Sequence, residues 1–249
     1  MKNPSLDIFT KSFSAPESPP HAFIQPIESP TQWRGGMTRP DALIFDLDGT
    51  LWDSTDAVCL AWNRVLVRNK PLRSPLLPSD IARIMGKSHV EIGKILFADL
   101  DAHSWETLSR ECYAEEEKVI RDQGGKLYRG VGEGLSQLSR VYRLFIVSNC
   151  QQGYIEAFLA WSGYQAQFKD FECYGNTGED KGRNLARLIR RNQLRAPVYI
   201  GDTQGDQSAA EAAQVPFYHV RYGFGRIAGG APGFDGFAEL TGYFLSLSD

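Results

Sequence analysis

Short apolar runs that alternate with helix-patterned segments constrain this fold more than any other feature of the sequence. Ala42 to Phe45 is one such run, and uninterrupted apolar runs are typical of strands buried on both faces of a sheet. Between the runs, apolar residues recur at helical spacing. This alternation predicts a Rossmann-like α/β fold, with a parallel sheet covered by helices on both faces. Strands are expected near 42–45, 144–147, 171–174, 198–200 and 217–220, and helices near 131–140, 154–161, 181–191, 207–213 and 235–247.

A block of purely helical pattern interrupts the alternation after the first strand. Apolar residues recur every three or four positions from Ser54 to about Gln123, and two glycines then end the pattern. The first strand still belongs with the later ones, so the helical block is an insertion. We expect a core formed by residues 37–53 and 124–249, and an all-helical cap formed by residues 54–123.

The first 36 residues differ in composition from the rest of the chain. They hold six prolines in a serine-rich stretch that has neither helical nor strand periodicity. Such a segment buries too little apolar surface to offset its ordering entropy, so we expect a disordered or loosely ordered tail. Met37 stands just before the first strand. The tail is therefore either an upstream extension without a function or a regulatory or docking segment, and the sequence leaves both open.

Overall charge and cysteine usage argue against several classes of partner. The formal net charge is -3, whereas proteins that bind nucleic acid polymers or anionic membranes carry a basic surplus. No apolar run approaches the roughly 18 residues of a membrane span, and the N-terminal region lacks a secretory core. The cysteines are scattered, as expected for reduced thiols. These features predict a cytoplasmic protein that binds neither nucleic acid polymers nor membranes.

Charged, amide and hydroxyl side chains gather immediately after the predicted strands. The first strand runs into Asp46-Leu47-Asp48-Gly49-Thr50, the second ends in Ser148-Asn149, and a later one is followed by Gly201 to Asp206. Lys181 opens the helix that precedes that later strand. Ligands of open parallel sheets bind beyond the carboxyl ends of the strands. We therefore expect these side chains to form one site.

The residue types at these strand ends suit transfer of a phosphoryl group. A carboxylate nucleophile can attack a phosphate ester only if the negative charge of the ester is neutralised. Asp46 and Asp202 can share a hard cation such as Mg²⁺, and Lys181 adds a second positive charge. Asp48 can protonate the departing alcohol and later take a proton from water. Donors for the phosphate oxygens are available from Thr50, Ser148 and Asn149.

These motifs resemble those of haloacid dehalogenase-superfamily phosphatases. The resemblance extends from Asp41 to the C-terminus, and the helical insertion is similar to the small cap of the phosphoglycolate phosphatase-like and β-phosphoglucomutase-like branch. One motif departs from the family pattern, because the common Lys-Pro-x-Pro is replaced here by Lys181-Gly182-Arg183-Asn184. The assignment of the family lysine to Lys181 therefore competes with Arg183.

The resemblance implies a role for each matching residue. Asp46 would be the nucleophile that forms an aspartyl-phosphate, and Asp48 the general acid and base. Mg²⁺ would be bound by Asp46, the main-chain carbonyl of Asp48 and Asp202, with Asp206 behind them. The residues implied to hold the phosphate are Ser148, Asn149 and Lys181.

Substrate recognition is expected to come from the cap. Lys87 and His89 follow Gly86 in a segment that faces the active site in relatives, so we predict that they contact the substrate. The acidic run Glu115 to Glu117 is interpreted as a solvated helix face, and His219 as a surface or packing residue. A small cap predicts a small soluble phosphomonoester, such as a phosphoglycolate-like acid, a sugar phosphate or a nucleotide. The sequence does not determine the oligomeric state.

Two other functions compete with hydrolysis. A phosphomutase would use the same motifs but return the phosphoryl group to a second hydroxyl group. A silent phospho-accepting binding module would keep the fold without turnover, although folding does not require two acids and a lysine at one site. A dehalogenase is disfavoured, because that chemistry needs neither the metal nor an acid at Asp48.

Overall fold

A computed structural model describes residues 39–69 and 74–247. The tail expected at residues 1–36 lies outside this part of the chain. None of the helices in the described ranges is long and apolar enough to cross a lipid bilayer.

The described residues form a six-stranded parallel sheet with the strand order β5-β4-β1-β6-β7-β8. β1 lies in the middle, so its carboxyl end is flanked by the ends of β4 and β6. This arrangement confirms the predicted Rossmann-like fold. The strands are β1 (Ala42–Phe45), β4 (Arg143–Ser148), β5 (Phe168–Cys173), β6 (Pro197–Gly201), β7 (Phe217–Val220) and β8 (Gly233–Phe234).

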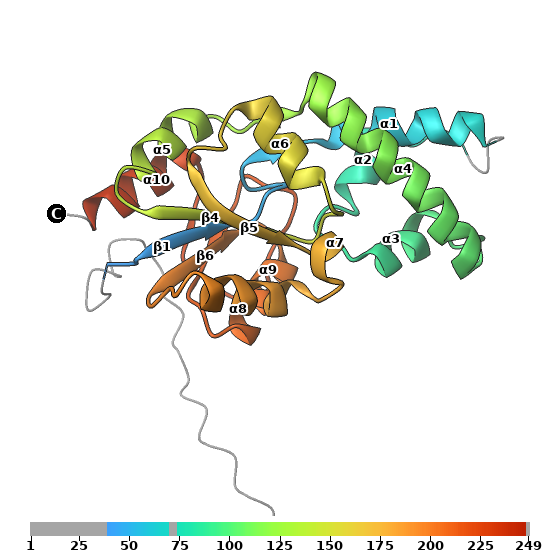
Figure 1. The fold of residues 1–249 in the computed structure, drawn as a ribbon. Coiled ribbons are helices and arrows are strands. Elements are labelled where there is room, and N and C mark those ends of the chain that lie inside the picture. The colour runs from blue at the N-terminus through green and yellow to red at the C-terminus, as the bar shows by residue number, and fades with distance from the viewer. Residues whose placement is uncertain (1–38, 70–73, 248–249) are drawn as a thin grey trace, which may run out of the picture.

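Helices cover both faces of the sheet, and every side chain of β1 is therefore buried. Leu43 and Phe45 belong to a cluster with Phe237, and the rings of Phe45 and Phe237 stack 5.9 Å apart. Ala42 and Ile44 point to the opposite face. Figure 1 shows α5 (Val131–Leu138), α6 (Tyr154–Ser162) and α10 (Phe237–Ser246) on one face, and α8 (Lys181–Arg191) and α9 (Gln204–Ala212) on the other. The short α7 (Tyr174–Thr177) follows β5.

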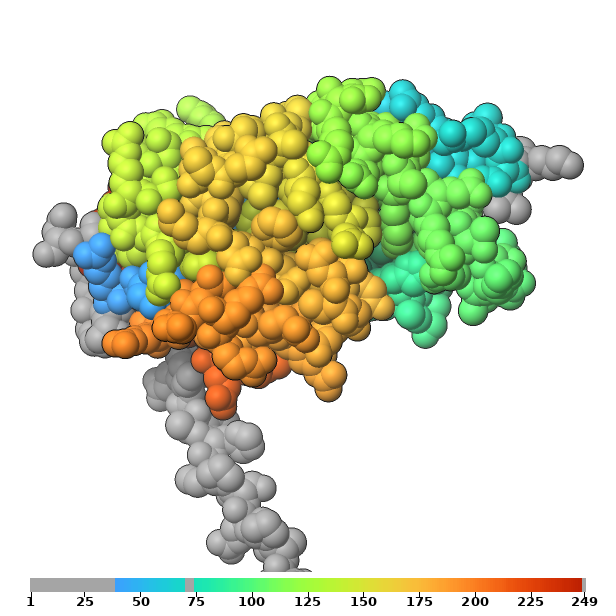
Figure 2. Space-filling view, in the orientation of Figure 1, coloured from blue at the N-terminus to red at the C-terminus, as the bar shows by residue number. Residues whose placement is uncertain are grey.

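The helical insertion lies beside the sheet. Its helices are α1 (Thr55–Arg68), α2 (Pro78–Ala82), α3 (His89–Leu96) and α4 (Ala102–Gln123). α4 packs on α1 and on α6, so it joins the insertion to the sheet-covering helices. Figure 2 shows the insertion as a cyan and green lobe next to the yellow and orange surface of the remaining chain.

The chain enters and leaves the insertion at one place. β2 (Trp52–Asp53) pairs antiparallel with β3 (Lys126–Leu127). The sequence did not predict this pair, because two-residue strands are too short to show a periodicity. β2 and β3 lie beside the carboxyl end of β1. The insertion is therefore connected to the rest of the chain next to the predicted site.

Other elements differ from the sequence expectation at their ends. α9 begins at Gln204 instead of residue 207, because Thr203 caps the helix and Asp206 completes a capping box. β5 begins at Phe168 and ends at Cys173, and β8 adds a strand after β7, which the sequence placed last. The cap residue of α2 is Leu77, and a proline occupies the first turn of that helix.

Candidate active site

The end of β1 carries the first two acidic residues of the predicted site. Asp46 continues the strand, and its backbone N–H donates to the Ile200 carbonyl at 2.8 Å. The chain then turns at Gly49, which has a φ of +82°. A Cβ atom there would lie 2.3 Å from Oδ2 of Asp202. Only glycine allows this backbone to approach Asp202 so closely.

Lys181 connects Asp46 to Asp206. Its Nζ lies 2.9 Å from Oδ1 of Asp46 and 2.6 Å from Oδ1 of Asp206. All three side chains are at most 5% exposed. Lys181 is the first residue of α8, and Asp180 caps that helix by accepting from the Arg183 N–H at 2.9 Å. Arg183 pairs with Asp180 on the surface, so Lys181 alone of these two cations contacts Asp46.

Asp46, Asp202 and Asp206 form a buried acidic cluster whose carboxylate oxygens lie within 4.8 Å of one another. Oδ2 of Asp202 accepts from the backbone N–H groups of Phe224 and Gly225, at 2.7 and 3.1 Å. Oδ1 of Asp202 is buried and has no hydrogen-bond partner in the described part of the chain. A buried acceptor without a donor is costly unless a cation contacts it.

Electrostatics within the cluster also fit a cation. Burial raises the pKa of Asp46, the charge of Asp206 raises it further, and Lys181 opposes both. Burial and Asp206 raise the pKa of Asp202 to about 7. For Lys181, the charges of Asp206 and Asp46 outweigh the effect of burial and raise its pKa. One lysine therefore leaves the carboxylates under-compensated. Hard carboxylate oxygens in this arrangement suit a divalent ion such as Mg²⁺.

Asp48 is not part of the acidic cluster, and its carboxyl group has separate hydrogen-bond partners. Its Oδ1 accepts from the Ser54 hydroxyl at 2.6 Å and from the Tyr154 hydroxyl at 2.8 Å. Burial raises the pKa of Asp48 to about 6, against these two hydrogen bonds. The sequence did not predict either partner of Asp48. Tyr154 is separated from Asp48 by 106 positions, and a tyrosine at the start of a helix is no signal of such a contact.

The predicted phosphate-binding residues Ser148, Asn149 and Thr50 lie near the end of β1 but differ in their surroundings. Ser148 ends β4 and lines a cavity with Asp46 and Asp48. Asn149 lines the same cavity, but its Nδ2 donates to the Gly86 carbonyl of the insertion at 2.9 Å. Thr50 is fully buried, and its hydroxyl oxygen has no partner among the described residues. Ser148 thus faces the cavity, Thr50 is not among the residues that line it, and Asn149 already connects the sheet to the insertion.

A cavity of about 520 Å³ lies between the strand ends and the helical insertion, and residues of both line it. Lys87 and His89 line it, as their predicted contact with a substrate requires. The ring nitrogens of His89 are already engaged, since Nδ1 lies 3.0 Å from the Tyr113 hydroxyl and Nε2 lies 3.2 Å from Glu106. The ring also stacks on Trp105 at 5.0 Å. His89 therefore positions its neighbours in the cavity wall, and Lys87 is the better candidate for a direct contact.

The interpretation of the acidic run on α4 as a solvated face is wrong for its middle residue. Glu115 and Glu117 pair with arginines on the surface. Glu116 is only 4% exposed and lines the cavity. Successive residues of a helix point about 100° apart, so three adjacent acids cannot share one face. The packing of α4 on its neighbours turns Glu116 inward.

His219 is a packing residue, as expected, but it packs next to the site. It is buried in β7, and its Nε2 lies 3.1 Å from the carbonyl oxygen of Asp202. Burial lowers the pKa of His219, so the neutral ring supports the backbone that carries Asp202. The sequence gives no sign of this contact, because Asp202 follows β6 and His219 lies on β7, 17 positions further along the chain.

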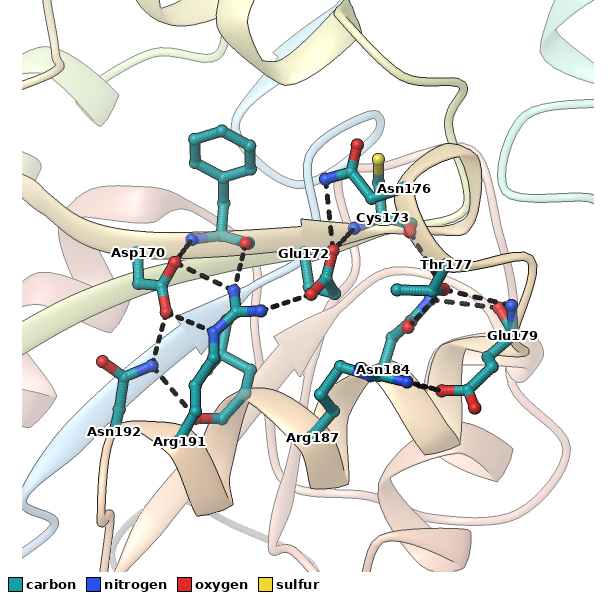
Figure 3. A network of polar contacts seen from close by, with 12 residues as sticks. Asp170, Glu172, Cys173, Asn176, Thr177, Glu179, Asn184, Arg187, Arg191 and Asn192 are labelled. Atoms are coloured by element: carbon teal, nitrogen blue, oxygen red, sulfur yellow. Dashed lines mark hydrogen bonds and ion pairs between the residues drawn. The ribbon is translucent and has the colours of Figure 1, made fainter.

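A polar network fixes α8, and with it Lys181, against the edge strand β5 (Figure 3). Arg191 forms ion pairs with Asp170, at 2.6 Å, and with the buried Glu172. At the other end of the helix, Asn184 accepts from the Thr177 hydroxyl at 2.7 Å and donates to the Glu179 carbonyl at 3.0 Å. The first turn of α8 is thereby held by side-chain hydrogen bonds, although it lacks the prolines of the common motif.

Comparison with known families identifies the group to which this site belongs. The model of the haloacid dehalogenase-like hydrolase family matches residues 43–220, well over half of the chain. The chain belongs to this family. The match includes Asp46, Asp48, Lys181, Asp202 and Asp206, and it confirms the resemblance found in the sequence.

Curated relatives of this family member are phosphatases. A phosphoglycolate phosphatase of Colwellia psychrerythraea is 30% identical over 206 residues, which cover 76% of this chain and 87% of that protein. One of Xanthomonas campestris is 27% identical over 194 residues, covering 76% and 86%. The family and these relatives show that the chain is a phosphatase, as predicted.

Solved structures share the fold. A predicted phosphoglycolate phosphatase from Haemophilus somnus has a TM-score of 0.72 and 21% identity, with 86% of this chain and all of that chain covered. CbbY from Rhodobacter sphaeroides in complex with phosphate has a TM-score of 0.68 and 18% identity, with 81% and 96% covered. At these identities the likeness concerns the arrangement of sheet and helices.

Proposed function

We propose that this enzyme hydrolyses a small soluble phosphomonoester with the help of Mg²⁺, through an aspartyl-phosphate on Asp46. One observation carries the proposal. The buried carboxylate of Asp46 is held by Lys181, belongs to a cluster with Asp202 and Asp206, and lines the cavity under the insertion. Nothing in the packing of an α/β sheet requires these charged groups to meet at its carboxyl edge.

The relatives and the cavity support a proposal for the substrate class. The curated relatives named above are phosphoglycolate phosphatases, and a structure of CbbY contains xylulose-1,5-bisphosphate. A cavity of about 520 Å³ holds a molecule of that size. We infer that the substrate is a small phosphorylated metabolite. A cytoplasmic location stays a prediction.

The metal would be held by carboxylate oxygens at the end of β1 and β6. The proposed ligands are the Asp46 carboxylate, the Asp48 carbonyl and Oδ1 of Asp202, which has no hydrogen-bond partner among residues 39–69 and 74–247. Asp206 is proposed to lie behind them, since its Oδ1 contacts Lys181 and its Oδ2 accepts from Thr203 at 2.9 and 2.6 Å. When bound, Mg²⁺ neutralises charge on the phosphoryl oxygens and so reduces their repulsion of the carboxylate.

Asp46 and Asp48 have different roles in each of the two proposed steps. A carboxylate oxygen of Asp46 bonds to phosphorus while the ester P–O bond breaks, and protonated Asp48 gives its proton to the departing oxygen. A water molecule then loses a proton to Asp48 and attacks phosphorus, which breaks the bond to Asp46 and releases phosphate. A pKa of about 6 lets Asp48 serve as acid and as base near neutral pH.

Two further sets of residues support these steps. Lys181 contacts one oxygen of Asp46 at 2.9 Å and therefore orients the carboxylate. Ser54 and Tyr154 hold the carboxyl group of Asp48 in place. Donors for the phosphoryl oxygens are proposed to come from Thr50, Ser148, Asn149 and Lys181. We further propose that residues 54–123 act as the cap that closes the cavity over a substrate.

Replacement of the nucleophile tests the proposal. Asp46→Asn should reduce phosphate release from p-nitrophenyl phosphate with Mg²⁺ by at least about 1,000-fold, because no attacking carboxylate remains. Asp56→Asn, an exposed acid on α1, is the matched control and should keep wild-type activity. Activity of the Asp46 variant within tenfold of wild type, roughly 1.4 kcal/mol, would contradict the assignment. Recovery of an isomerised phosphate ester in place of inorganic phosphate would identify a mutase.

A further inference from the structure

Glu116 is a buried carboxyl group in the cavity that the proposed mechanism does not use. It stands on α4 of the insertion, opposite the end of β1, and is 4% exposed. Charged side chains are seldom buried so completely unless they are paired with an opposite charge. Among the described residues, no cation forms an ion pair with Glu116.

The partners of Glu116 are neutral donors. Oε2 accepts from the Trp62 indole N–H at 2.5 Å, and Oε1 accepts from the Gln151 side-chain amide at 3.0 Å. Both bonds favour the ionised form, in which the group can only accept. A carboxylate has about four acceptor positions, so two remain for another molecule. Gln151 belongs to the loop after Ser148, so Glu116 is held beside the catalytic strand ends.

The wall of the cavity around Glu116 carries more acids than cations. Its acids in the described residues are Asp46, Asp48, Glu106 and Glu116, whereas its lysine and arginine residues are Lys87 and Arg110. Arg110 is already paired with Glu106 at 2.9 Å. Lys87 lies on the loop next to Gly86, beside the sheet-proximal part of the insertion. The α4 side of the cavity, where Glu116 lies, thus presents acceptors without a spare positive charge.

We propose that Glu116 is a specificity-determining residue that selects phosphomonoesters whose leaving group carries a hydrogen-bond donor, a hydroxyl or an ammonium group, over those that carry a carboxylate. This inference rests on the proposed phosphatase function. A donor can pair with the remaining lone pairs of Glu116, while a substrate carboxylate would face a like charge in a site of low dielectric. The chain would then differ in substrate preference from the phosphoglycolate phosphatases that it resembles in sequence.

The test compares substrates on the full-length protein with Mg²⁺, at about pH 8, where ionised Glu116 prevails. Phosphoethanolamine and glycerol 1-phosphate provide donors, phosphoglycolate provides a carboxylate, and p-nitrophenyl phosphate provides neither. The wild type should prefer the donor substrates in kcat/KM. Glu116→Gln should shift the ratio of donor to carboxylate substrates by at least about 10-fold toward phosphoglycolate, with p-nitrophenyl phosphate changed by less than about 3-fold.

Two further variants separate selection from a structural effect. Glu117→Gln, the neighbouring surface acid, should behave as the wild type on every substrate. Glu116→Asp keeps the charge and should retain a preference for donors, and it serves as the informative variant if Glu116→Gln lowers the melting temperature.

Each contrary result has a distinct meaning. An unchanged substrate ratio in Glu116→Gln overturns the inference, and so do equal losses on all four substrates, since they reflect folding alone. A wild-type preference for phosphoglycolate also overturns it. These results leave hydrolysis of p-nitrophenyl phosphate by the wild type intact. If the wild type releases no phosphate from that compound with Mg²⁺, the proposed function itself fails, and the inference fails with it.

Discussion

At the scale of single residues, surroundings decide what each buried carboxyl group can do. Asp206 contacts a lysine, and the attraction of Lys181 outweighs burial and lowers its pKa. Asp48 accepts from the hydroxyl groups of Ser54 and Tyr154, and burial raises its pKa to about 6. Glu116 receives an indole and an amide, and burial raises its pKa to about 7. The same functional group is therefore an ion-pair partner at Asp206, the proposed proton donor at Asp48 and the proposed selective acceptor at Glu116.

The raised pKa of Glu116 predicts a pH-dependent stability. The folded protein holds this proton up to about pH 7, whereas the unfolded chain releases it near the ordinary value of 4.5. The folded state therefore binds more protons between these values, and its stability falls as pH rises through them. Glu116→Gln removes that loss. Its melting temperature should gain a few degrees relative to wild type between about pH 5 and about pH 8.

Thermal melts across this pH range check the prediction. Glu117→Gln provides the control, because that acid is on the surface and paired with Arg121. A constant difference in melting temperature between Glu116→Gln and wild type would show that Glu116 has the same proton affinity in the folded and unfolded states.

At the scale of elements, α8 connects the edge of the sheet to Lys181, which contacts Asp46 and Asp206. Its last turn is held by Arg191, whose partner Glu172 is buried on β5. Arg191→Ala would leave that carboxylate unpaired. Because the arginine side chain is 38% exposed, we expect a loss of roughly 1–3 kcal/mol in the free energy of unfolding, below the full value of a buried pair.

Denaturant unfolding measures this loss. Arg190→Ala changes the neighbouring exposed arginine, for which the described residues show no ion pair, and should cost less than about 0.5 kcal/mol. Equal effects of the two changes would mean that the network in Figure 3 does not hold α8.

The loop between α2 and α3 carries a lysine that faces the cavity. Lys87 lines the cavity, and the Gly86 carbonyl next to it accepts from Asn149. Lys87→Ala should lower kcat/KM on the preferred substrate by roughly 10 to 100-fold and leave p-nitrophenyl phosphate nearly unchanged. Lys94→Ala, an exposed lysine on α3 outside the cavity, is the control. Equal losses on both substrates would assign Lys87 to the fold or the chemistry.

At the scale of the whole molecule, the acidic cluster predicts that a divalent ion contributes to both activity and stability. EDTA should abolish turnover and Mg²⁺ should restore it. A ligand that binds only the folded state at about 100 times its Kd adds about 2.7 kcal/mol, so Mg²⁺ should also raise the melting temperature. Asp202→Asn should weaken both effects, whereas Asp56→Asn should leave them unchanged. Full activity in chelator, or a melting temperature that is independent of Mg²⁺, would contradict a metal at this site.

The amino-acid sequence was sufficient for those features that depend on neighbours along the chain. Apolar runs and helical spacing predicted the sheet and the insertion, since burial of a strand or helix face is encoded in local periodicity. The clustering of Asp46, Asp202 and Lys181 could also be predicted, because the carboxyl ends of parallel strands meet at one edge. Their chemical roles remain predictions from the motifs.

Contacts between distant segments were decided only by the tertiary structure. Tyr154 reaches Asp48, and Gln151 reaches Glu116, across separations of 106 and 35 positions. No local sequence pattern predicts these pairs. An acidic run likewise predicts a solvated helix face, although packing can bury one of its residues. Which side chains meet depends on how helices pack on the sheet and on one another. For that reason the strand ends that carry the candidate site could be located from sequence, while the partners of Asp48 and the acidic wall of the cavity required the folded chain.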